Sequence, residues 1–80
     1  MKLPRDVSGR DLVKALGWLD DEVDHQTSSH VHLTTQRGGE HHVTVPTHEA
    51  IKIGTLNAIL HAVADHFGLS RDELLRTLFR

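Results

Sequence analysis

The chain has 80 residues, with 9 Lys or Arg, 11 Asp or Glu and 8 His, and a formal net charge of -2 at pH 7. This length suits one domain with a single core, and we treat residues 1–80 as that domain. The lack of cysteine excludes disulfides, thiolate zinc sites and cysteine nucleophiles. The negative charge argues against a strong, sequence-independent nucleic-acid binder. No apolar run approaches the roughly 18 residues of a membrane span, and the N-terminus is too polar for a signal peptide. We therefore expect a cytoplasmic protein without membrane contact.

Residues 7–19, "VSGRDLVKALGWL", are predicted to form the first helix. Ser8 is a suitable N-cap, and Asp11 follows it at the spacing of a capping box. Apolar residues recur at helical spacing and should face the core, although Gly17 is unusual inside a helix. The mostly acidic segment 20–24 then turns the chain and begins a short strand around Val23.

Residues 27–35, "TSSHVHLTT", and residues 41–46, "HHVTVP", are predicted to pair as a hairpin, because the "QRGGE" between them supplies loop glycines. Apolar and polar residues alternate along both strands, so one face is buried and one is wet. We call the wet side the histidine face; it contains His30, His32, Thr34, His42 and Thr44. His41 points with the valines but should reach water at the strand end.

A loop over 46–54 precedes a second predicted helix over 55–67, which Gly68 ends as a C-terminal cap. The last helix is predicted over 69–79, where Ser70 and Glu73 form a capping box. The order helix, three strands, helix, helix, with one apolar sheet face, predicts a two-layer α+β fold.

Three chemistries are open to the histidine face. His30, His32 and His42 could bind zinc, but two histidines at strand spacing plus one neighbour are not a metal signature. A serine hydrolase is improbable, because neighbours on a strand such as Ser29 and His30 point to opposite faces and no Gly-x-Ser-x-Gly elbow exists.

The third chemistry is RNA cleavage without metal. The ribose 2′-hydroxyl already lies beside the phosphodiester, and one histidine can serve as general acid or base. Cations must also hold the phosphate. The candidates are scattered in the sequence, so folding must gather them: Lys2, Arg5, Arg10 and Lys52.

Several blocks of the chain follow one another in an order that resembles the HicA family of toxin–antitoxin proteins. They are "MKLPRDVSGRDLVKAL", Ser-His opening a strand, "GGEHHVTVPTH", "GTLNAIL" and "FGLSRDELL", covering roughly Leu3 to Phe79. The resemblance implies a fold like that of double-stranded-RNA-binding domains. It also implies an mRNA interferase that acts independently of the ribosome and is neutralised by a HicB antitoxin.

The family's essential histidine lies in a Gly-Ser-His motif, which falls here on Ser28, Ser29 and His30. Ser28 replaces the glycine and could deny a conformation that glycine permits. His25 and His32, like Thr27, stand where the resemblance leads us to expect basic residues. Asp20 and Asp21 replace a glycine and an aromatic residue, and the acidic stretch that they begin should repel RNA near the site.

The expected function is therefore a metal-independent, ribosome-independent mRNA endoribonuclease toxin that uses a single catalytic histidine and no cofactor. His30 is its expected general acid or base, and Ser29 orients that histidine or the phosphate. The expected RNA contacts are Ser28, His32, Lys52 and Arg10. A HicB-type antitoxin should cover the histidine face. The alternative is a catalytically weakened or inactive domain, similar to a double-stranded-RNA-binding domain, that binds RNA or the antitoxin.

Overall fold

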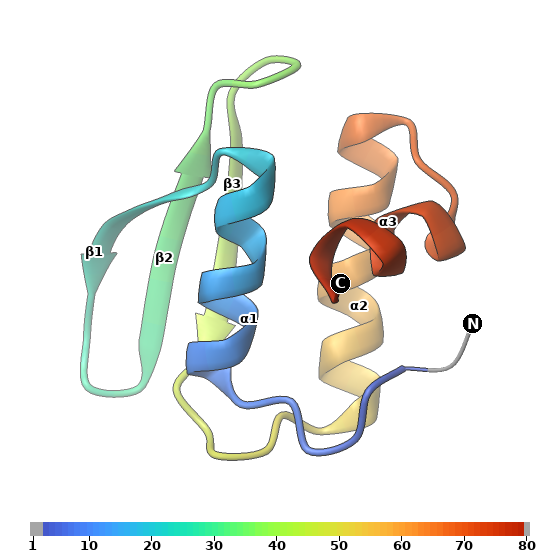
Figure 1. The fold of residues 1–80 in the computed structure, drawn as a ribbon. Helices are drawn as coiled ribbons and strands as arrows, with labels where there is room; N and C mark the ends of the chain where they lie inside the picture. Colours follow the sequence, from blue (N-terminus) through green and yellow to red (C-terminus); the bar gives the residue numbers. More distant parts are fainter. Residues whose placement is uncertain (1–2, 80) are drawn as a thin grey trace.

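The computed structural model describes residues 3–79 (Figure 1). Its elements follow in the order α1 (Gly9–Leu16), η1 (Gly17–Leu19), β1 (Glu22–Gln26), β2 (His30–Thr35), β3 (His41–Pro46), α2 (Ile53–Phe67) and α3 (Arg71–Leu78). The three strands form one antiparallel sheet in the order β1-β2-β3. The predicted α+β class and the predicted order of elements are both confirmed.

The two short helices begin at capping boxes, as the sequence predicted. Ser8 Oγ accepts a hydrogen bond from the Asp11 backbone at 3.0 Å, and Ser70 Oγ accepts one from Glu73 at 3.2 Å. The first helix is shorter than predicted. It ends at Leu16, and Gly17 opens a separate 3₁₀ turn, in keeping with the low helix propensity of glycine.

The predicted faces of the hairpin are confirmed by the strand register. Val31 pairs with Val45 and Leu33 with Val43 on the buried side. On the histidine face, His32 pairs with Thr44 and Thr34 with His42. The predicted start of the strand is wrong, because β2 begins at His30 and residues 27–29 form the turn from β1.

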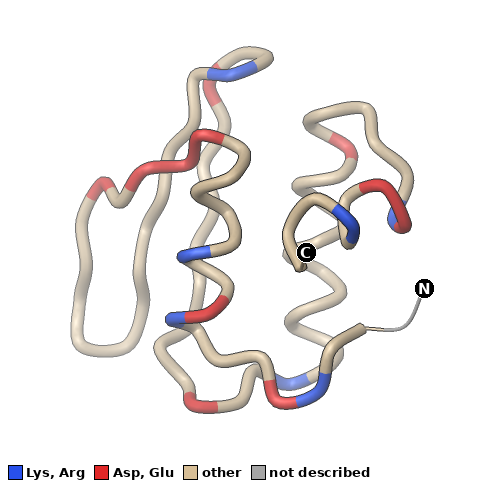
Figure 2. Tube along the Cα trace, viewed as in Figure 1, with Lys and Arg blue, Asp and Glu red and all other residues tan. Residues whose placement is uncertain are grey.

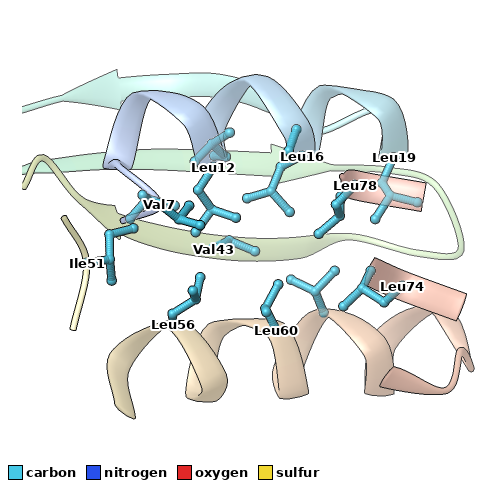
Figure 3. Close-up of a cluster of buried hydrophobic side chains, with 14 of the residues drawn as sticks. Val7, Leu12, Leu16, Leu19, Val43, Ile51, Leu56, Leu60, Leu74 and Leu78 are labelled. Atoms are coloured by element: carbon cyan, nitrogen blue, oxygen red, sulfur yellow. The ribbon is translucent and has the colours of Figure 1, made fainter. Parts of the chain in front are cut away.

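The core lies between the sheet and the helices, and Figure 3 shows leucines of α1 and α2 pointing toward one another beside β3. Leu12 and Leu16 of α1 and Leu56 and Leu60 of α2 are each at most 2 % exposed. Strand β1 stands outside this arrangement, and all five of its residues are exposed. The part of the sheet that is most exposed to solvent is therefore the β1 side.

His41 reaches water only in part, and not freely as expected. Its side chain is half-buried, and its ring stacks on His66 of α2 with centroids 4.3 Å apart. α2 runs along this end of β3 and takes the space that solvent would fill.

Among residues 3–79, none of the helices combines the length and hydropathy that crossing a bilayer requires.

Candidate nucleic-acid interface and acid–base site

The turn between β1 and β2 fixes His30. The Thr27 backbone N–H donates to the His30 carbonyl at 2.9 Å, and Thr27 Oγ1 accepts from the His30 backbone N–H at 3.1 Å. Ser29 Oγ lies 2.9 Å from His30 Nδ1. Strand alternation argued against this contact, whereas the resemblance to the HicA family led us to expect that Ser29 orients His30 or the phosphate. Since Ser29 lies in the turn, the alternation of a strand does not apply to it.

His30 borders a cavity of about 620 Å³ between the histidine face and the first turns of α2. The hairpin contributes His30 and Thr44, and α2 contributes Thr55 and Ile59 to its walls. Lys52, which immediately precedes α2, also lines it. The fold thus brings together two of the predicted site residues, His30 and Lys52, that are 22 positions apart in the sequence.

His48 lines the same cavity, although it was not among the predicted site residues. It lies in the loop between β3 and α2, where spacing arguments for helices and strands do not apply. The one signal that pointed to it was its place at the end of the block "GGEHHVTVPTH".

A row of imidazoles extends from His30 across the exposed sheet. The ring of His32 lies 6.5 Å from that of His30 and stacks on His25 with centroids 4.2 Å apart. His32 Nδ1 is 3.2 Å from Thr44 Oγ1. His42 is engaged elsewhere, with Thr34 and Glu40. Within residues 3–79, no group of three or more His, Asp or Glu side chains is arranged to hold a metal ion.

Arg10 does not line the His30 cavity. It borders a second cavity, of about 730 Å³, between α1 and β1. His48 lines both cavities and so marks the boundary between them. Arg5 is exposed and lines neither cavity, and Lys2 lies outside the described residues.

The main chain of Ser28 ties the β1–β2 turn to the loop after β3, because its carbonyl accepts a hydrogen bond from Thr47 Oγ1 at 3.1 Å. Its backbone is not left-handed; among the described non-glycine residues, only Asp6 and Asp20 have positive φ. The serine at this position therefore meets no backbone strain of the kind that glycine would relieve.

The acidic stretch enters the sheet at the end opposite to His30. Glu22 pairs with Thr34, whereas the β1–β2 turn joins the other ends of the strands. Figure 2 shows the red segment between α1 and β1 at the top of the sheet, far from the turn at the bottom. Asp20, Asp21 and Glu22 therefore do not lead directly into the site, because the rest of β1 lies between them and the turn. Asp24, within β1, is closer and accepts a hydrogen bond from Thr34 Oγ1 of the histidine face at 3.3 Å.

One of these acidic residues, Asp21, is buried at 6 % exposure, and neither of its carboxylate oxygens has a hydrogen-bond partner among residues 3–79. Burial raises the pKa of Asp21 to about 6; the charge of His66 opposes this shift and that of Asp20 adds to it. Burial also lowers the pKa of the nearby His41, aided by the charges of His66 and His42. Nothing in the local sequence marks Asp21 for burial.

The chain thus belongs to a class of small α+β domains. In its site, an exposed histidine that contacts a serine borders a cavity that a lysine also lines. The family model described as "HicA toxin of bacterial toxin-antitoxin" matches residues 9–64, from α1 through most of α2. The chain belongs to the HicA family, as a toxin of a toxin–antitoxin system, and an antitoxin is therefore its partner. Neither the curated proteins nor the solved structures gave a match. The matched segment includes His30, His48 and Lys52.

Proposed function

We propose that this toxin is a metal-independent, ribosome-independent mRNA endoribonuclease in which His30 is an acid–base catalyst. The observation that carries the proposal is the setting of His30. Its ring is exposed at the edge of a cavity, and its Nδ1 is held by Ser29. Within the described chain, Nε2 has no hydrogen-bond partner, so it is available to a substrate.

The chemistry needs no cofactor. The ribose 2′-oxygen attacks the adjacent phosphorus, and an imidazole side chain can accept or donate the protons that this step moves. Lys52, in the same cavity, supplies a positive charge for the phosphate. The RNA strand continues past His48 toward Arg10 in the neighbouring cavity.

The remaining predicted contacts lie on either side of His30. Ser28 sits in the β1–β2 turn. The exposed ring of His25, stacked on the half-buried His32, offers an imidazole face on which a base can stack. With a net charge of -2, the toxin must rely on such local contacts and not on overall attraction. Its substrate, mRNA, places its action in the cytoplasm.

A HicB-type antitoxin is the proposed partner, bound over the histidine face. This position blocks the approach to His30 without requiring the toxin to unfold. Thr44 is exposed on this face. Thr44→Arg, which places a bulky charge there, should lower the affinity for the antitoxin at least tenfold. Asn57→Arg, on the exposed part of α2, should leave it unchanged and is the matched control.

The test is cleavage of a long, mostly single-stranded RNA by the purified toxin in EDTA, from pH 5.5 to 8. His30→Ala should lower the rate by roughly 100-fold or more. His61→Ala removes an exposed histidine of α2 outside the cavity and should cleave like the parent. Cleavage by His30→Ala at the parent rate would overturn the role of His30. No cleavage by a folded parent would favour a domain that only binds.

A further inference from the structure

The cavity beside His30 holds a second imidazole whose main chain is anchored on both sides. The Thr47 backbone N–H donates to the Ser29 carbonyl at 2.9 Å, which ties this loop to the turn that carries His30. On the other side, the Gly9 backbone N–H donates to the His48 carbonyl at 2.9 Å. His48 is thus fixed between the β1–β2 turn and the start of α1.

α1 also presses closely on this segment. A Cβ at Gly9 would overlap the carbonyl oxygen of Pro46 and meet Thr47 Cα. Only a glycine at the start of α1 lets the helix lie this near to the loop. The imidazole of His48 is exposed although its backbone is held. A residue that only connected two elements would need no such anchoring.

We propose that His48 is the second catalytic histidine of this site, paired with His30 in general acid–base cleavage of RNA. This inference rests on the proposed function and extends it. In-line attack places the entering O2′ and the leaving O5′ on opposite sides of phosphorus. One imidazole cannot reach both oxygens at once, whereas two that border one cavity can each serve one of them.

This pair accounts for both protons, the one that leaves O2′ and the one that O5′ receives. O2′ forms a bond to phosphorus while its proton passes to the neutral imidazole. The P–O5′ bond breaks, and O5′ takes a proton from the protonated imidazole. The products are a 2′,3′-cyclic phosphate and a 5′-hydroxyl, and no metal, water or other reactant is consumed.

Several charged or titratable groups lie around His48. His30 and Lys52 face it across the cavity, and Glu49 follows it in the chain. Arg10 and Asp11 of α1 line the second cavity that it borders. A neutral imidazole paired with a protonated one gives a bell-shaped dependence of rate on pH.

The experiment compares the parent with His48→Ala, His48→Gln, His30→Ala and His61→Ala on RNA in EDTA across pH 5.5 to 8. Both His48 variants should cleave roughly 100-fold or more slowly than the parent and lose one limb of the bell. His61→Ala should keep the parent's rate and profile. Thermal unfolding of His48→Gln, in which an exposed side chain is replaced, should match the parent and so exclude misfolding.

A second substrate separates acid–base chemistry from mere positioning. An RNA with sulfur in place of O5′ at the cleaved position has a leaving group that needs no proton. It should restore cleavage by one of the two variants, His30→Ala or His48→Ala, at least tenfold relative to the other. Rescue of neither, or parent-like cleavage by His48→Ala, would overturn the pairing while leaving the role of His30 intact. Failure of the folded parent to cleave RNA would instead overturn the proposed function.

Discussion

Ser29 Oγ lies 2.9 Å from His30 Nδ1, and this contact holds an exposed imidazole in one orientation. Ser29→Ala should therefore slow RNA cleavage about 2- to 12-fold, which corresponds to the roughly 0.5–1.5 kcal/mol of one hydrogen bond. Stability should not change, because both side chains are exposed. Initial rates on one RNA, beside urea unfolding, check both statements.

Ser28→Ala is the matched control for that variant. Within the described chain, Ser28 contributes its carbonyl and not its hydroxyl to the hydrogen bonds that hold the turn. The alanine variant should therefore cleave like the parent at saturating RNA, and the loss of its predicted RNA contact should lower only the affinity. Equal losses in the two variants would show that the turn, and not the hydrogen bond to His30, was disturbed.

The two predicted phosphate contacts differ in their distance from the reacting groups. Lys52→Gln removes a charge from the His30 cavity, and Arg10→Gln removes one from the neighbouring cavity. Each should reduce the slope of log affinity against log salt by roughly 0.7, the value for one phosphate of a single strand. Only Lys52→Gln should also lower the rate at saturating RNA.

Lys14→Gln controls for net charge, because Lys14 is exposed on α1 and lines neither cavity. Its salt dependence should equal that of the parent. The same measurement of affinity at several salt concentrations serves for all three variants. If Lys14→Gln reduced the slope of log affinity against log salt as much as Lys52→Gln does, RNA binding would depend on overall charge and not on the cavity.

The capping boxes, the alternation of the hairpin and the glycine cap were readable from the sequence because each depends on residues close together in the chain. The buried setting of Asp21, the stacking of His41 on His66 and the anchoring of His48 were not. Each depends on contacts between segments far apart, such as α1 against the loop after β3. Strand alternation argued against the Ser29 contact only because the strand was predicted to begin three residues too early.

The buried carboxyl of Asp21 should make stability depend on pH. Its pKa is raised to about 6 from 3.8, so folding favours the protonated form. Its contribution to stability is fully present below about pH 4 and is lost as pH rises through 6. The full loss is up to about 3 kcal/mol. The free energy of unfolding of Asp21→Asn, relative to that of the parent, should therefore rise by about 1–3 kcal/mol from pH 4 to pH 7.5.

Urea unfolding of both proteins at several pH values measures this difference. Comparing the two cancels the opposite effect of His41, whose lowered pKa makes its protonation cost stability as pH falls. Asp65→Asn, an exposed change on α2, should show no such trend. A difference between Asp21→Asn and the parent that stays constant with pH would contradict the buried, protonated carboxyl.

Two glycines of the first helical segment should respond oppositely to alanine. Gly9→Ala places a methyl group against the Pro46 carbonyl and should destabilise the fold by about 1–3 kcal/mol. It should also slow RNA cleavage beyond that effect, because the displaced loop carries His48. Gly17→Ala meets open space at φ -58°, and should stabilise the fold by about 0.4–1 kcal/mol with cleavage unchanged. Urea unfolding and initial rates test both variants. A Gly9→Ala protein as stable and as active as the parent would show that α1 does not hold the loop in place.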